Sequence, residues 1–178
     1  MVNMLFAQGF EEVEALTVVD MLRRAGVEVS MVSAYNTEFV EGAHGISVKM
    51  DVNLDDVKDS EMVILPGGIP GVPNLLANEK VTELIKQYYK DDKYIAAICA
   101  APTILDELRI VDNKNVTCYP SCAEKLKNSN YTDDAVTVDG KIITSKAVGT
   151  ALEFSFKLIE ILKDADVAES VKNSVYYR

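Results

Sequence analysis

The chain has 178 residues, of which 48% are hydrophobic, and its 18 basic and 28 acidic side chains give a formal charge of −10. This length predicts a single domain, residues 1–178, whose core needs no disulfide bonds. The acidic balance argues against nucleic acid or an anionic membrane as a partner, because few basic groups could neutralise phosphates. A histidine-rich metal site is also excluded, since His44 is the only histidine.

The chain start gives no sign of export. Residues 1–6 lack a basic segment and are soon followed by Glu11 and Glu12, which is not the pattern of a signal peptide. No apolar stretch approaches the ~18 residues that span a bilayer. Three cysteines, an odd number without a secretory signal, indicate reduced thiols. We therefore expect a cytoplasmic protein.

Short apolar runs alternate with amphipathic runs along the first half of the chain. The predicted elements are a strand at 4–7, a helix at 11–25, a strand at 27–34, extended segments or a small hairpin at 40–49, a strand at 62–65, and a helix capped by Asn78 that reaches 89. The first helix has acidic residues in its first turn and basic residues in its last, and Gly26 ends it.

The second half continues the alternation. It predicts a strand at 94–98, a helix from 100 to about 108 with Pro102 in its first turn, a strand at 116–119, strands at 135–138 and 141–145 flanking an Asp139-Gly140 turn, and helices at 149–162 and 165–175. Apolar strands that alternate with helices predict a mostly parallel sheet covered on both faces. The fold class is therefore an α/β three-layer sandwich.

The strongest candidate for chemistry is Cys99, which directly follows the 94–98 strand and precedes a helix. Ligands gather at the carboxyl ends of the strands in such sheets. Small residues at Ala97 and Ala101 are typical of a nucleophile elbow, a tight, strained turn that exposes its nucleophile. The start of a helix would also favour the thiolate form. The alternative is a buried cysteine at the end of a core strand.

Gly67 and Gly68 follow the 62–65 strand, where glycines allow a ligand to approach the backbone closely. Their amides could stabilise an oxyanion or a thiolate, although an ordinary turn between strand and helix is the alternative. The loop lacks the Lys-Ser/Thr of a phosphate-binding loop, and no Gly-x-Gly-x-x-Gly sequence follows the first strand. Nucleotide binding is therefore disfavoured.

Glu14 lies on the first helix among apolar neighbours. Buried beside a thiolate it would have to be protonated, because two adjacent anions repel each other. The residues alone favour a solvated glutamate on the helix face.

The remaining cysteines and the histidine are predicted to be structural. Cys118 and Cys122 lie on either side of Pro120 and are interpreted as packed thiols, the first in a strand and the second near a helix start. With His44, interpreted as a loop histidine, they do not complete a zinc site. No metal is therefore predicted.

Four motifs occur in a fixed order: Gln8 to Ala15 (QGFEEVEA), Leu65 to Gly68 (LPGG), Ala97 to Pro102 (AICAAP) and Gly149 to Phe154 (GTALEF). In this combination, essentially the whole chain resembles the ThiJ/PfpI superfamily, and most closely its parkinsonism-associated deglycase (DJ-one) branch. The resemblance implies a flavodoxin-like sandwich related to class I glutamine amidotransferases. It also implies a homodimer.

The resemblance further implies roles for single residues. Cys99 corresponds to an oxidisable nucleophile, and Glu14 to a protonated carboxyl group that hydrogen-bonds it, the opposite of the interpretation from the residues alone. The amides of Gly68 and Ala100 correspond to oxyanion-hole donors. His44 stands where the branch often has an arginine near the dimer interface and the mouth of the active site.

Three positions depart from relatives within the superfamily. Ala100 replaces the histidine of the protease-like branch, which makes a peptidase improbable. Tyr119 stands where several members have a histidine near the thiol, and a tyrosine is a poor base near neutral pH. Val148 stands where many relatives have a proline, so the rim of the pocket is expected to differ.

The sequence therefore predicts a cofactor-free cysteine enzyme of the glyoxalase or deglycase type. Its substrates would be reactive carbonyls such as methylglyoxal, or the adducts that these form with proteins. The alternative is a stress protein without turnover, a redox sensor or chaperone in which Cys99 is oxidised to a sulfinate.

Overall fold

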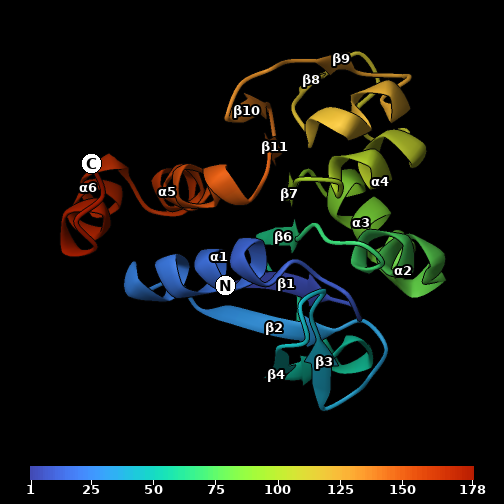
Figure 1. Ribbon diagram of the computed structural model, residues 1–178, viewed down its shortest axis with the longest axis horizontal. Coiled ribbons are helices and arrows are strands. Elements are labelled where there is room, and N and C mark those ends of the chain that lie inside the picture. The colour runs from blue at the N-terminus through green and yellow to red at the C-terminus, as the bar shows by residue number, and fades with distance from the viewer.

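The computed structural model describes residues 1–178, and a seven-stranded sheet lies at its centre (Figure 1). The strand order is β10-β11-β7-β6-β1-β2-β5. These strands are β1 (Val2–Phe6), β2 (Val29–Ser33), β5 (Val52–Asn53), β6 (Met62–Leu65), β7 (Tyr94–Ile98), β10 (Val136–Asp139) and β11 (Ile142–Ser145). All neighbours are parallel except the β10–β11 pair. The predicted mostly parallel sheet is confirmed.

Helices cover both faces of the sheet, as the alternation of apolar and amphipathic runs predicts. In Figure 1, one group lies to the left and the other to the right of the sheet. The left group is α1 (Glu12–Arg24), α5 (Ala151–Leu162) and α6 (Ala165–Ser174). The right group is α2 (Gly71–Ala77), α3 (Glu79–Lys90) and α4 (Pro102–Glu107). The three-layer α/β sandwich is thereby confirmed.

Two buried hydrophobic clusters fill the spaces between the sheet and the helices on its two faces. Along β1, Met4 and Phe6 pack toward α1 and α5, whereas Leu5 and Ala7 pack toward α2, α3 and α4. This alternation follows from the two-residue period of a strand, which sends successive side chains to opposite faces. Because both faces are buried, the strands consist of continuous apolar residues.

Short elements surround this frame. They are the antiparallel hairpin β3 (Phe39–Glu41) and β4 (Ser47–Lys49), the pair β8 (Asn115–Val116) and β9 (Asn130–Tyr131), and the 3-10 helices η1 (Leu54–Asp56), η2 (Pro120–Lys125) and η3 (Val148–Thr150). The hairpin confirms the extended segments predicted at 40–49. None of the helices is long and apolar enough to cross a membrane.

Some predicted details are wrong. The strand predicted at 116–119 is shorter and covers only Asn115–Val116, so Cys118 lies outside any strand. The chain then turns into η2, which begins at Pro120. Helix α2 was not predicted, since Gly71 and Pro73 look like parts of a loop; Pro73 is tolerated in the first helical turn, which needs no amide donor. The turn between β10 and β11 is one residue later than predicted, because Asp139 already pairs with Ile142.

Candidate active site

Cys99 lies on a strained turn between β7 and α4. Its φ angle is 65°, a left-handed conformation that costs a non-glycine residue roughly 1–3 kcal/mol. The Cys99 amide donates to the Ser145 carbonyl (2.9 Å), and the Cys99 carbonyl accepts from the Tyr119 amide (2.7 Å). Of the three cysteines, it is the one that is partly exposed. The turn therefore holds the thiol at the carboxyl end of the sheet, within reach of solvent.

Glu14 reaches this turn from the first turn of α1. Its side chain is fully buried, and Oε2 accepts a hydrogen bond from the Gly67 amide at 3.0 Å. The other carboxyl oxygen, Oε1, is buried without a regular hydrogen bond. The solvated helix-face glutamate favoured by the residues alone is therefore wrong. The cause is positional, since Glu14 lies on a face of α1 that meets the loop after β6 rather than solvent.

Gly67 makes room for both side chains. A Cβ atom at this position would lie 2.6 Å from Cys99 Cβ and 3.0 Å from Cys99 Sγ, and it would overlap Glu14 Oε2. Real Cβ atoms do not approach other atoms this closely. The absence of a side chain at Gly67 thus allows the carboxyl and thiol groups to occupy the same small space.

The shared space controls the charge of the pair. Burial raises the pKa of Glu14 to about 7, and the nearby Glu11 adds to this, while contacts with the Cys99 thiol and the amides of Gly67 and Val148 favour the carboxylate. Burial also raises the pKa of Cys99 well above its usual range, and the negative charge of Glu14 raises it further. The two groups therefore carry at most one negative charge near neutral pH.

The start of α4 does not give Cys99 a lowered pKa, contrary to the sequence-based expectation. The Ala100 amide does favour the thiolate, but burial and Glu14 outweigh it. Helix α4 has only six residues. A short helix with a single amide facing the sulfur cannot offset the loss of water around a buried anion.

The loop after β6 supplies a second amide. Gly68 has a φ angle of 102°, and a Cβ atom on it would overlap the backbone of residues 9–11. The Gly68 amide donates no hydrogen bond within the chain. Gly67 contacts Cys99 and Ala100 follows it in the chain, so both lie at the Cys99 turn, whereas the oxyanion-hole role of the Gly68 and Ala100 amides stays a prediction.

His44 is not in contact with this pair. Its Nδ1 lies 2.9 Å from Glu12 Oε2, and its amide donates to Glu12 Oε1 at 2.7 Å. The hydrogen bond to Glu12 raises the pKa of His44, and the charge of Glu11 contributes. Burial alone would raise the pKa of Glu12, but its hydrogen bonds to His44 and Ile46 lower it overall.

The burial of Glu12 was missed by the sequence reasoning, which counted it only among the acidic residues of the first helical turn. The one sequence signal is Gly42, where a Cβ atom would overlap the Glu12 carboxyl group. Glu11, Glu12 and His44 also form the one group whose donor atoms lie close enough together, within 4.8 Å, to hold a metal ion. The His44–Glu12 hydrogen bond already accounts for their arrangement.

Tyr119 contacts the Cys99 turn through its backbone. Its amide binds the Cys99 carbonyl, but its ring is 46% exposed and its hydroxyl group makes no hydrogen bond. No hydrogen bond therefore joins the Tyr119 side chain to the Cys99 sulfur. Val148 is 42% exposed, and its amide interacts with Glu14.

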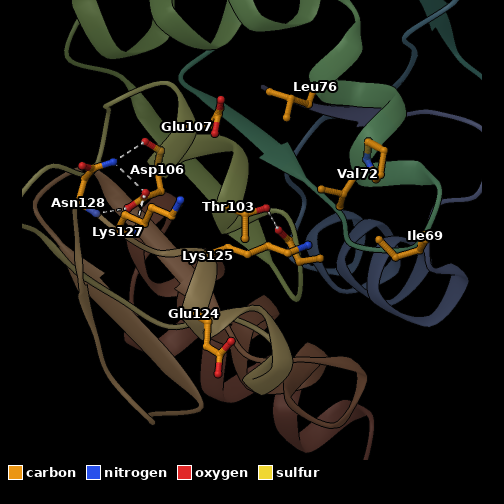
Figure 2. Close-up of a pocket in the computed structure, with 12 residues that line it drawn as sticks. Ile69, Val72, Leu76, Thr103, Asp106, Glu107, Glu124, Lys125, Lys127 and Asn128 are labelled. Atoms are coloured by element: carbon orange, nitrogen blue, oxygen red, sulfur yellow. Dashed lines mark hydrogen bonds between the residues drawn. The ribbon is translucent and has the colours of Figure 1, made fainter.

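A cavity of about 380 Å³ lies beside the Cys99 turn (Figure 2). Ala100 lines it, but Cys99 and Glu14 do not. Figure 2 shows Ile69, Val72 and Leu76 on one side and the polar residues of α4 and η2 on the other, including Thr103 and Lys125. The cavity therefore adjoins the candidate site without containing its reactive groups.

Known proteins match this chain over most of its length. A sequence model of the DJ-1/PfpI family matches residues 1–161. Protein DJ-1 homolog B of Arabidopsis thaliana is 36% identical over 97% of this chain, which spans only 40% of that protein. Glutathione-independent glyoxalase DJR-1.2 of Caenorhabditis elegans is 37% identical over 90% of this chain, which spans 87% of that protein.

A solved structure agrees with these matches. Oxidized DJ-1 of Toxoplasma gondii superposes with a TM-score of 0.94 at 31% identity, covering 99% of this chain and 97% of that one. The flavodoxin-like arrangement expected from the sequence is confirmed by this likeness.

Proposed function

The chain belongs to the DJ-1/PfpI family, and we propose that it is a cysteine-dependent glyoxalase or deglycase that works without metal or cofactor. Its substrates would be methylglyoxal-like carbonyls or their protein adducts. One observation carries the proposal: the Cys99 thiol and the Glu14 carboxyl group share the space over Gly67. The similarity to a nematode protein named as a glutathione-independent glyoxalase supports it.

The pair supplies a nucleophile and a proton carrier in contact. Cys99 sulfur attacks the aldehyde carbon, and its proton passes to Glu14 and then to the oxygen of the resulting hemithioacetal. The regenerated Glu14 carboxylate removes the proton from that carbon and delivers it to the adjacent carbonyl carbon, while the hemithioacetal hydroxyl proton passes to the oxygen of that carbonyl group. This leaves a thioester, which water hydrolyses to a hydroxy acid, lactate in the case of methylglyoxal.

The charge of the pair suits this sequence of steps. A group that both accepts and donates protons is most effective when its pKa lies near the working pH, and burial raises the pKa of Glu14 to about 7. The amides of Gly68 and Ala100 would stabilise the oxyanion that forms as sulfur adds to the carbonyl. In this proposal, the Cys99 turn is a nucleophile elbow.

The second candidate function is a redox sensor or chaperone without turnover. The exposure of Cys99 favours it, because an oxidant reaches this thiol before the buried Cys118 and Cys122. The oxidized state named for the Toxoplasma relative is consistent with such chemistry. In that case Cys99 would gain two oxygen atoms, and no carbonyl would be turned over.

We also propose that two copies associate in the cytoplasm. An apolar groove between α1 and α5 supports the homodimer; it is lined by Val13, Leu16, Met21, Val148 and Leu152. Val13, one of the residues that line the groove, is 48% exposed, so association would remove apolar surface from water. Light scattering of the purified protein tests the association.

Lactate formation separates the two candidate functions. The full chain, incubated with methylglyoxal in the absence of glutathione and with a chelator present, should form lactate. The Cys99→Ala variant should form none, whereas Cys118→Ala should behave as the original protein. Absence of lactate from the original protein, or its formation by Cys99→Ala, would contradict the enzymatic proposal.

A further inference from the structure

Cys122 lies close to Cys99, although the proposed mechanism does not use it. The connection runs through Tyr119, whose amide donates to the Cys99 carbonyl and whose carbonyl accepts from the Cys122 amide, each at 2.7 Å. Cys122 thus lies on η2, directly against the turn that carries Cys99. Both side chains pack in the cluster between the sheet and α4.

The two thiols also interact electrostatically. Charge on Cys122 raises the pKa of Cys99, which adds to the larger effects of burial and Glu14. This influence agrees with the short connection between the two cysteines through Tyr119. Charge on Cys122 also raises the pKa of Cys118.

The three thiols differ in accessibility. Cys99 is partly exposed, Cys122 is 8% exposed, and Cys118 is fully buried with its sulfur directed at the Tyr119 carbonyl (3.4 Å). An oxidant from solvent therefore meets Cys99 first, and Cys118 is the least reactive of the three.

The segment that carries Cys122 has room to adjust. Glu124 and Lys125 of η2 line the cavity of about 380 Å³ in Figure 2. A 3-10 helix has weaker hydrogen-bond geometry than an α-helix. Because a disulfide needs Cα atoms roughly 4.4–6.8 Å apart, η2 is the element that would shift to bring the two sulfur atoms into bonding distance.

We propose that Cys122 is the resolving thiol of Cys99, so that oxidation by a hydroperoxide ends in a reversible Cys99–Cys122 disulfide. In the first step, Cys99 sulfur attacks the peroxide oxygen, and a sulfenic acid and an alcohol or water form. Cys122 sulfur then attacks the sulfenic sulfur, the S–S bond forms and water leaves. The two thiols supply the two electrons that reduce the peroxide.

This inference rests on the proposed function, in which Cys99 is the nucleophile, because the disulfide would regulate that site. Turnover stops while the sulfur is bonded to Cys122, and a small thiol restores it by exchange. The disulfide also protects Cys99 from the irreversible step to a sulfinic acid. Its formation does not require that the protein turns over methylglyoxal, so the two proposals can fail separately.

Peptide mass spectrometry after mild hydrogen peroxide treatment tests the disulfide. Trypsin places Cys99 in the peptide 94–109, and both Cys118 and Cys122 in the peptide 115–125. The original protein should yield these two peptides joined, with a mass lower by two hydrogen atoms. Cys118→Ala, which keeps the buried position apolar, should give the same joined pair and so identify Cys122 as the partner.

The Cys122→Ser variant provides the opposite outcome. Its Cys99 should gain two oxygen atoms at the peroxide dose that joins the peptides of the original protein, and dithiothreitol should no longer reverse the change. The proposal is overturned if the original protein accumulates the same doubly oxygenated Cys99 as Cys122→Ser, or if the bridge joins Cys118 instead. Lactate formation before treatment, measured separately, reports on the proposed function alone.

Discussion

The Glu14 carboxyl group and the Cys99 thiol meet over Gly67, which has no side chain to separate them. Burial raises the pKa of both groups, and the Glu14 carboxylate raises the pKa of Cys99 further, whereas the contact with Cys99 favours the Glu14 carboxylate. A proton shared between a nucleophile and a carboxyl group is the feature on which the proposed chemistry depends.

Removing the charge of Glu14 should make the Cys99 thiol more acidic. The Glu14 carboxylate raises the pKa of Cys99, so Glu14→Gln should lower it, and iodoacetamide should alkylate Cys99 faster at pH 8. Alkylation rates measured between pH 6 and 10 give the pKa of both proteins. A higher thiol pKa in Glu14→Gln would mean that the carboxyl group stabilises the thiolate instead.

The stability of the fold should depend on pH through Glu14. Its pKa rises from 4.5 to about 7 on folding, so its stabilising contribution is complete below about pH 4.5 and is lost as the pH rises through about 7. The free energy of unfolding should fall by about 3 kcal/mol across this range. Urea unfolding should show a lower free energy of unfolding at pH 8 than at pH 5 in the original protein but not in Glu14→Gln. Equal decreases in both proteins would mean that another group causes the pH dependence.

A methyl group at Gly67 should disrupt the site. The Cβ atom of Gly67→Ala would overlap Glu14 Oε2 and crowd Cys99, so we expect lost turnover and a destabilisation of about 1–3 kcal/mol. Gly149→Ala is the matched control, because nothing lies within 4 Å of a Cβ atom there. Thermal unfolding and lactate formation measure both effects, and an active, stable Gly67→Ala protein would contradict the observed geometry.

The single histidine allows a direct test of the Glu12 contact. The hydrogen bond to Glu12 raises the pKa of His44 above its ordinary 6.5, and Glu12→Gln should bring it back down. Proton NMR follows this titration without overlap, since His44 is the only histidine. Glu14→Gln, the control on the same helix, should leave the His44 titration unchanged.

The fold could be predicted because its signals are local. The apolar run 62–65 and the Asn78 cap reappear in the structure at the predicted positions, the cap through hydrogen bonds from the Lys80 and Val81 amides. Helix α2 could not be predicted in this way, because its seven residues include a glycine and a proline at the start. Its position depends on packing against the loop at Gly9.

The site was predictable only in part. The small residues around Cys99 indicated a tight turn, and the structure places a left-handed residue there. The residues alone could not tell which glutamate of the first helix turn is buried, because Glu11, Glu12 and Glu14 have the same chemistry. The family resemblance pointed to Glu14, and the contact with Gly67, far away in the sequence, determines its burial.

The most direct test of the central claim compares two measurements on the Glu14→Gln variant. If Glu14 carries the proton between the two carbons, lactate formation from methylglyoxal should fall about 100- to 10,000-fold while Cys99 remains open to alkylation. Glu11→Gln, three residues earlier in the chain, is the control and should retain most of the activity. Undiminished lactate formation by Glu14→Gln would contradict the account, because the thiol would then act without the carboxyl group that it meets over Gly67.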